Sequence, residues 1–412
     1  MLSYRLAGAL SLLSVAGALP LVAQTTSVPA NDRYLARAIR ILKQTPLIDG
    51  HNDLPWRIRE DSIARGNVAA YDLRKHTPGH TDLDRLRRGM VGAQFWSVYI
   101  PGDWRDSGYA RVQLEQIDIA RQMIARYPDR LALALSAADI RRDFKQGKIG
   151  SLLGVEGGHA IENSLGALRA YYDLGARYMT LTHNVTLDWA DAALDSAKHD
   201  GLTPFGDSVV REMNRLGMLV DLAHVSPATM SDALNVSQAP VIFSHSAARA
   251  LVDVPRNVPD SILRRLTANG GIVMVPFVTG FVSPAVMLYD QSTRPVMKDL
   301  RAKYGNDTAA ITREINQWRT THPEPRATLS QVADQIEYVR KVAGADHVGI
   351  GGDFDGITEV VQGLEDVSTY PALFAELARR GWSDSDLRKL AGENFLRVFA
   401  QAEAVAKRLQ KK

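Results

Sequence analysis

Four of the ten histidines in the chain follow short apolar runs and have acidic residues nearby. The run PLIDGHND places His51 and Asp53 two positions apart, and residues i and i+2 of a strand point to the same face. A lone histidine at a strand end is most often structural. Several of them together with carboxylates predict a metal centre, because imidazole and carboxylate groups bind zinc, manganese and iron. The residues placed in this way are His51, Asp53, Glu156, His183, His224, His245, Asp353 and Asp355.

Five of these residues form a candidate set of metal ligands: His51, Asp53, Glu156, His224 and His245. Five ligands are awkward for one tetrahedral zinc ion but natural for two ions that share a bridging carboxylate. Two ions about 3.5–4 Å apart can lower the pKa of a shared water and polarise a carbonyl. The set therefore predicts a binuclear hydrolytic site.

Eight apolar runs, bounded by glycine or polar residues, recur along the chain. Most are nearly continuous in apolar residues, which is typical of strands buried on both faces of a parallel sheet. The candidate ligands stand at the ends of these runs. The runs are PLIDGHND (46–53), VGAQFWSVYI (91–100), GSLLGVEG (150–157), RYMTLTHN (177–184), GMLVDLAH (217–224), PVIFSH (240–245), GIVMVPF (271–277) and HVGIGGDFDG (347–356).

Amphipathic stretches between the runs predict helices over 109–127, 164–175, 207–217, 259–270 and 328–344. Eight strands that alternate with helices predict an α/β fold, a (β/α)8 TIM barrel with a helical C-terminal tail. Such barrels build their active sites at the carboxyl ends of the strands.

Two spans exceed the usual length of barrel loops. Residues 54–90 are charged, and residues 278–327 hold scattered proline, arginine and aspartate. We expect both to be insertions that carry loops and short helices.

The N-terminus has the pattern of a secretory signal peptide over residues 1–23, with Arg5 before an Ala/Leu-rich stretch. A transmembrane anchor is the alternative, but the stretch is short for a span and contains Pro20. We therefore expect cleavage, export to the periplasm or the extracellular space, and no transmembrane span in the mature protein. The rest of the chain is expected to form a single barrel domain over residues 32–405.

Composition narrows the classes of function. The chain is 45% hydrophobic and 23% charged, and its net charge is only +3 with no basic runs, so a nucleic-acid partner is not expected. It contains no cysteine, which excludes thiolate catalysis, cysteine–zinc sites and disulfides. A non-covalent homodimer stays open.

Eight motifs resemble those of the membrane dipeptidase (renal dipeptidase) family of zinc metallopeptidases, which belongs to the amidohydrolase-type barrels. They run in order from about residue 32 to 400: IDGHNDLPW, VGAQFWSVY, GVEGGHA, LTHN…WAD, DLAHVS, FSHSAAR, RNVPD and GGDFDG. The resemblance implies a dipeptidase with two zinc ions per chain, in which a hydroxide that bridges the ions attacks the peptide carbonyl. Mammalian members carry disulfide cysteines and a lipid-anchor tail, and this chain is expected to have neither.

The resemblance also implies a role for each metal ligand. His51 and Asp53 would hold one zinc ion, and His224 and His245 would hold the other. Glu156 would bridge the two ions.

Three more positions gain roles from the resemblance. His183 would lie by the substrate and help to stabilise the tetrahedral intermediate. Arg256, in PRNVPD, would bind the terminal carboxylate of the dipeptide, which suits the bidentate geometry of a guanidinium group. Asp353 would be the acid/base that moves a proton to the leaving amine. Asp355 is its rival, and Asp353 is favoured because the apolar run GIGG leads directly into it.

Two other functions remain open from the residues themselves. A barrel hydrolase for a cyclic amide, ester or lactone could use the same metal centre, although an arginine for a free carboxylate favours dipeptides. A secreted metal-binding or solute-binding protein without catalysis would not need the acid/base candidate.

Overall fold

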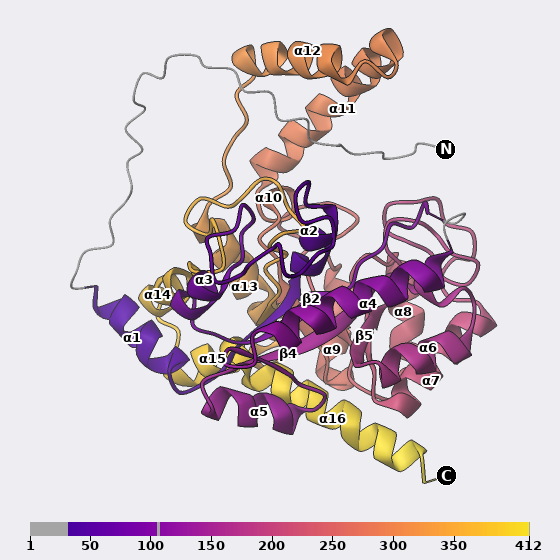
Figure 1. Ribbon diagram of the computed structural model, residues 1–412, viewed down its shortest axis with the longest axis vertical. Helices are drawn as coiled ribbons and strands as arrows, with labels where there is room; N and C mark the ends of the chain where they lie inside the picture. Colours follow the sequence, from indigo (N-terminus) through magenta and orange to yellow (C-terminus); the bar gives the residue numbers. More distant parts are fainter. Residues whose placement is uncertain (1–31, 105–107, 412) are drawn as a thin grey trace.

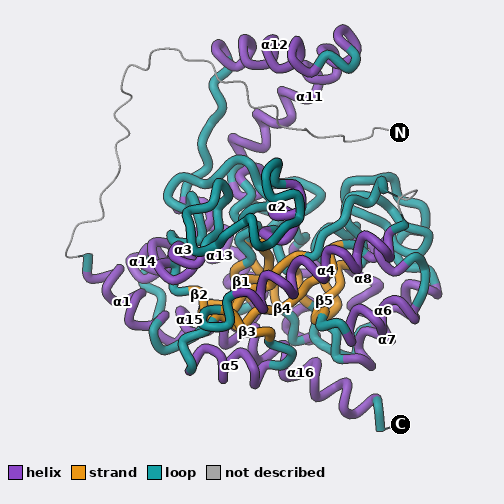
Figure 2. The backbone as a smooth tube through the Cα atoms, viewed as in Figure 1, coloured by secondary structure: helices purple, strands orange, loops and turns teal. Residues whose placement is uncertain are grey.

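Strands at the centre and helices around them form a barrel in the computed structural model of the chain, which describes residues 32–104 and 108–411 (Figure 1). The predicted signal peptide, residues 1–23, lies outside the described residues. Figure 2 shows the strands in the middle of the molecule, with loops gathered on its upper side. The strands are β1 Leu47–Asn52, β2 Val91–Ser97, β3 Leu131–Leu133, β4 Ile149–Glu156, β5 Ala176–Thr180, β6 Leu219–Asp221, β7 Ile242–Phe243, β8 Ile272–Val275 and β9 Val348–Ile350.

Eight of these strands close into a parallel ring in the order β1-β2-β4-β5-β6-β7-β8-β9. The ring closes because β2 pairs with β4 and β1 pairs with β9, both in parallel. Each of the eight predicted runs overlaps one strand of the ring, so the predicted TIM barrel is confirmed. The short strand β3 was not predicted, and it pairs with the first residues of β4 beside the ring.

Capping residues mark the helix boundaries, as α7 shows at both of its ends. In α7, the Thr203 side chain accepts a hydrogen bond from the Gly206 N–H, Pro204 occupies the first turn, and Gly217 adopts a left-handed conformation at the C-terminus. The helices are α1 Arg33–Leu42, α2 Leu54–Glu60, α3 Leu83–Arg88, α4 Tyr109–Arg126, α5 Ala137–Lys145, α6 Leu165–Asp173, α7 Pro204–Leu216, α8 Pro227–Val236, α9 Asp260–Asn269, α10 Thr279–Val282, α11 Pro284–Tyr304, α12 Thr308–Thr321, α13 Leu329–Ala343, α14 Tyr370–Arg379, α15 Asp384–Arg388 and α16 Asn394–Leu409.

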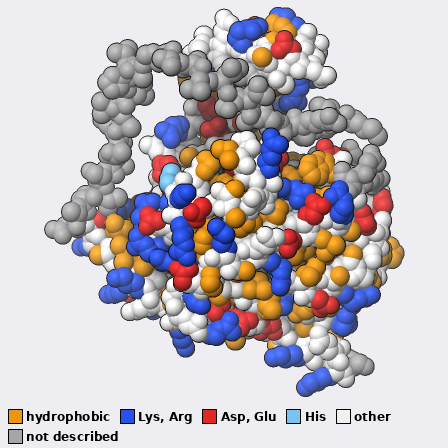
Figure 3. Space-filling view, viewed as in Figure 1, with side chains coloured by type: hydrophobic (Ala, Val, Ile, Leu, Met, Phe, Trp, Pro, Cys, Tyr) orange, Lys and Arg blue, Asp and Glu red, His pale blue; other side chains and the backbone are white. Residues whose placement is uncertain are grey.

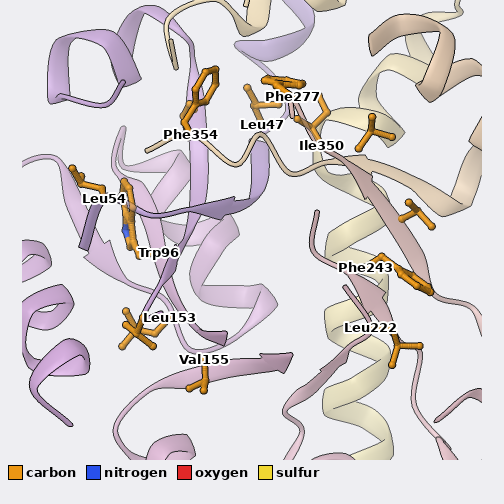
Figure 4. Close-up of a cluster of buried hydrophobic side chains, with 14 of the residues drawn as sticks. Leu47, Leu54, Trp96, Leu153, Val155, Leu222, Phe243, Phe277, Ile350 and Phe354 are labelled. Carbon is orange, nitrogen blue, oxygen red and sulfur yellow. The ribbon is translucent and has the colours of Figure 1, made fainter. Parts of the chain in front are cut away.

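Two hydrophobic layers hold the barrel together. The outer layer lies between the strands and the surrounding helices, and Figure 4 shows part of it, including Trp96, Leu153 and Phe243. The inner layer fills the ring and continues into α16, where the ring of Phe395 packs edge-on against Phe95 at 5.4 Å. The predicted C-terminal helix is therefore part of the core.

The second predicted insertion contains longer helices than expected. Within residues 278–327, α11 has 21 residues and α12 has 14, so the prediction of short helices was wrong there. α12 packs on α11, α11 packs on both α12 and α10, and the two long helices rise above the barrel (Figure 1). On the face shown in Figure 3, lysine and arginine side chains are interspersed with aspartate and glutamate. Among the described helices, none combines the length and the hydropathy needed to cross a bilayer.

Candidate active site

The predicted metal ligands lie together at the carboxyl ends of the barrel strands. His51 lies near the end of β1, and Glu156 is the last residue of β4. His224 comes three residues after β6, and His245 comes two residues after β7. The parallel ring thus gathers side chains that are up to 194 positions apart, counted from 51 to 245.

Glu156 is the centre of this group because its two carboxylate oxygens face different histidines. Its Oε2 lies 3.4 Å from Nε2 of His51. Its Oε1 lies 3.1 Å from Nε2 of His224 and 3.6 Å from Nε2 of His245. The Ser97 hydroxyl donates a hydrogen bond to Oε2 at 3.0 Å and fixes the carboxylate. This is the arrangement that a bridging carboxylate requires.

Asp53 reaches the site from outside the strand. β1 ends at Asn52, and Asp53 precedes the first residue of α2, so the expected alternation within one strand does not place it. Its Oδ2 nevertheless lies 3.1 Å from Nε2 of His51. Oδ1 of Asp353 lies 3.9 Å from the same nitrogen. These three side chains could hold one metal ion.

The histidines are oriented by partners that the sequence prediction missed. Nδ1 of His51 pairs with the Tyr178 hydroxyl at 2.8 Å, and Nδ1 of His224 pairs with Oδ1 of Asn184 at 3.1 Å. In both histidines Nε2 is therefore left to face Glu156. Such support is typical of metal-binding histidines, because the outer hydrogen bond fixes the ring and its tautomer.

His245 is oriented through a buried relay. Its Nδ1 pairs with the Ser244 hydroxyl at 2.9 Å, and that hydroxyl donates to Oδ2 of Asp221 at 2.6 Å. Thr180 donates to the same oxygen at 2.6 Å. A buried aspartate inside an apolar strand was the sequence signal for this relay, since a carboxylate in such a place needs hydrogen-bond donors.

The electrostatic surroundings favour neutral imidazoles at two positions. Burial lowers the pKa of His224 and His245 well below the ordinary value, and the nearby positive charge of Arg256 adds to the effect. A metal ligand must be an unprotonated imidazole, so these two histidines are ready to bind without losing a proton.

His51 and Asp353 carry shifts in the opposite direction. Burial lowers the pKa of His51, but the Tyr178 hydroxyl beside it and the negative charges of Glu156 and Asp53 outweigh this effect and raise that pKa well above the ordinary value. Burial raises the pKa of Asp353 well above its ordinary value, and the Glu156 carboxylate contributes to the rise. Acidic groups packed this closely favour a bound cation.

The donor set fits metal ions. Nε2 of His51 is buried and makes no hydrogen bond within the described residues, although three carboxylates surround it. Nε2 of His224 and Nε2 of His245 lie only 2.9 Å apart, so both could coordinate one ion. Nitrogen and carboxylate oxygen without sulfur is a donor set suited to zinc and related divalent ions.

Two residues at the site hold unusual backbone conformations. His224 has φ = 67° and Asp353 has φ = 63°, in the left-handed region that residues with a side chain rarely adopt. Such conformations cost free energy and persist where the surrounding structure enforces them. Here they turn the His224 side chain toward Glu156 and the Asp353 side chain toward His51, in each case three residues after a strand ends.

Arg256 and His183 flank the group. Arg256 is only 2% exposed, its guanidinium lies over the Phe281 ring, and its Nη1 makes no hydrogen bond within the described residues. It lines a cavity of about 190 Å³ between its own loop and α10–α11. Nε2 of His183 lies 3.7 Å from Oε1 of Glu156, and its ring packs against Tyr99. His183 is therefore also within reach of a metal ion.

Asp355, the rival of Asp353, faces away from the ligands. Its Oδ1 accepts a hydrogen bond from the backbone N–H of His80 at 2.7 Å. Its Oδ2 is buried without a hydrogen bond to the described residues and lies in none of the candidate metal groups. The geometry thus favours Asp353 as the carboxyl that acts on a substrate.

Comparison with known proteins agrees with this geometry. Residues 35–412 match the membrane dipeptidase family, peptidase family M19. The probable dipeptidase PvdM from Pseudomonas aeruginosa has a similar structure, with 26% identity and a TM-score of 0.77 over 91% of this chain and 100% of that one. Dipeptidase AC, a metallopeptidase of family M19, shows 25% identity and a TM-score of 0.71 over 87% and 98% of the two chains.

A third solved structure shares the fold. It is a metallopeptidase from Rhodobacter sphaeroides liganded with a phosphinate mimic of the dipeptide L-Ala-D-Ala. It is 24% identical, with a TM-score of 0.71 over 87% of this chain and 99% of that one. At this identity the likeness supports the barrel architecture alone.

Proposed function

Because the chain belongs to the membrane dipeptidase family of metallo-dipeptidases, we propose that it hydrolyses dipeptides at a centre of two zinc ions. The observation that carries the proposal is the position of Glu156. Its Oε2 faces His51 and its Oε1 faces His224 and His245, at 3.1–3.6 Å. One ion would take His51 and Asp53, the other would take the two remaining histidines, and Glu156 would bind both.

The residues around the centre have separate tasks in this proposal. Bound zinc supplies Lewis acidity, which lowers the pKa of a water and polarises a carbonyl. Asp353 takes a proton from the attacking water and delivers it to the leaving amine, because its Oδ1 lies beside the proposed ligands, 3.9 Å from Nε2 of His51. His183, at the open side of the site, donates to the oxyanion that develops on the substrate carbonyl.

Arg256 supports a dipeptide over a neutral cyclic substrate. A buried guanidinium whose Nη1 has no hydrogen-bond partner among the described residues is costly unless an anion binds it. The free carboxylate of a peptide can satisfy the group, whereas a lactone or a neutral cyclic amide offers no such charge. The arginine therefore favours a substrate with a carboxylate close to the scissile bond.

Metal analysis combined with dipeptide turnover tests the proposal. We expect about two equivalents of zinc in the active protein, loss of activity on chelation, and its return with zinc. Glu156→Gln should retain less than two equivalents and lose nearly all turnover. Full activity with one equivalent of zinc would refute the binuclear centre. A zinc-loaded protein that hydrolyses lactones or cyclic amides but no dipeptide would refute the substrate class.

A further inference from the structure

A loop before α3, residues 77–82, bonds to the end of β1 and to the segment that follows β9, although it supplies none of the candidate site residues. Nδ2 of Asn52, at the end of β1, donates to Oγ1 of Thr81 at 2.9 Å. The backbone N–H of His80 donates to Oδ1 of Asp355 at 2.7 Å. The backbone N–H of Asp355 in turn donates to Nδ1 of His80 at 3.0 Å. The loop therefore ties the end of β1 to the segment that follows β9.

The loop is itself held rigidly. Arg85, the third residue of α3, is 4% exposed and donates from Nη1 to the Gly79 carbonyl at 2.7 Å and from Nη2 to Oγ1 of Thr77 at 2.7 Å. Its Nε pairs with Oδ2 of Asp82 at 2.6 Å. An arginine whose guanidinium bonds are distributed in this way fixes the backbone at both ends of the loop.

The segment after β9 needs such support. Asp353 and Asp355 both have left-handed backbone conformations, with φ = 63° and φ = 65°, which cost free energy for residues with side chains. Asp353 is anchored from one side, where its N–H donates to the His51 carbonyl at 3.1 Å. The reciprocal bonds between His80 and Asp355 anchor the segment two residues later.

We propose that His80 is a positioning residue for the reaction: through its paired bonds with Asp355 it holds Asp353 at its place beside the metal ligands. The role given to Asp353 rests on the proposed function. The hydrogen bonds require only an acceptor at the place of Nδ1, since the other contact uses the backbone N–H of residue 80. An asparagine side chain can place an oxygen there, and an alanine cannot.

The variants His80→Ala and His80→Asn test the proposal in the full zinc-loaded protein, and His76→Ala is the matched control. His76 lies in the adjoining stretch of chain, and 79% of its side chain is exposed. Its Nδ1 lies 3.5 Å from Oδ2 of Asp82, but it takes no part in the bonds between His80 and Asp355. For His80→Ala we expect kcat on a dipeptide to fall by about 10- to 100-fold, because small misplacements of a reacting group have effects of that size. KM should stay within about threefold and zinc content should not change, since Arg256 and the ligands are untouched.

His80→Asn should recover most of the lost kcat, and His76→Ala should match the parent protein. Amide hydrogen exchange of the segment 351–357 gives a readout independent of turnover. It should quicken in His80→Ala, return toward the parent rate in His80→Asn, and stay unchanged in His76→Ala.

Three results would overturn the proposal. One is a His80→Ala protein whose kcat, or whose rate of amide hydrogen exchange in segment 351–357, equals that of the parent. Another is a His80→Asn protein no better than His80→Ala, and the third is a loss of zinc that accounts for the whole loss of kcat. Asp355→Asn keeps an acceptor for the His80 N–H and should lose far less kcat than Asp353→Asn; equal losses would instead make Asp355 a catalytic residue. Failure of the parent protein to cleave dipeptides would count against the proposed function, while the exchange rates would still decide whether His80 holds the segment.

Discussion

Arg256→Ala removes the group that would bind the substrate carboxylate. The guanidinium is 2% exposed, burial lowers its pKa to about 10, and Nη1 makes no hydrogen bond within the described residues. It is therefore charged at neutral pH and poised for an anion. A charge-assisted hydrogen bond in such a place contributes about 1.5–3 kcal/mol. At about 1.4 kcal/mol for each tenfold change, kcat/KM on dipeptides should fall by about one to two orders of magnitude.

A dipeptide and its C-terminal amide, assayed side by side, separate carboxylate recognition from other effects. The amide lacks the negative charge, so Arg256→Ala should change its kcat/KM far less than that of the free dipeptide. Arg256 also donates weakly to the His245 carbonyl at 3.5 Å, so zinc content must be measured and should equal that of the parent. Arg264→Ala, on the exposed face of α9, serves as an arginine-to-alanine control. Equal losses on both substrates would refute the carboxylate assignment.

Three further predictions concern stability and export. Burial lowers the pKa of His159 to about 4, so as the pH falls the unfolded chain takes up a proton at this imidazole before the folded chain does. The free energy of unfolding should therefore fall by about 2–3 kcal/mol between pH 7 and pH 4.5. Urea unfolding of His159→Gln should show a smaller fall over the same pH range. Phe395→Ala should lower the free energy of unfolding by about 3–5 kcal/mol, because it opens a cavity where α16 meets the inner layer; a loss below 1 kcal/mol would contradict that packing. We propose export of the chain, and N-terminal sequencing of mature protein should then begin near residues 24–31, whereas an intact Met1 in membranes would indicate an uncleaved anchor.

The sequence predicted the barrel because parallel strands that are buried on both faces leave continuous apolar runs. All eight runs became strands of the ring. β3 was not predicted because it consists only of leucine and alanine, which favour helices, and lacks the β-branched and aromatic residues typical of strands. The length of α11 was not predicted because this helix buries little of its surface. It therefore lacks the apolar stripe that identifies a helix packed on a barrel.

The candidate site was predictable as far as residue type and strand position determine it. The ligands gather because the carboxyl ends of parallel strands meet at one edge of the barrel. The residues that orient them were not predicted, because a hydrogen bond such as that between His51 and Tyr178 depends on the register of strands far apart in sequence. Asp355 shows most plainly that the position of a residue in a motif does not determine where its side chain lies. It lies two residues from Asp353, yet its side chain bonds to the 77–82 loop.

The candidate metal ligands and the cavity beside Arg256, which we propose receives the C-terminal residue of the substrate, are held by different parts of the fold. This separation has a consequence for specificity. The ligands stand on strand ends within the closed ring, whereas the cavity beside Arg256 is also lined by Phe281, Met287 and Asp290 from α10 and α11. Because α11 belongs to an inserted segment above the barrel, a change there should not move the ligands. Met287→Ala should therefore change the ratio of kcat/KM values between dipeptides with small and large C-terminal residues by about 10-fold, the size expected for a few methylene contacts. Zinc content and thermal stability should stay at the parental values. A uniform loss on all dipeptides together with lost zinc would show that α11 supports the metal centre instead of shaping the substrate cavity.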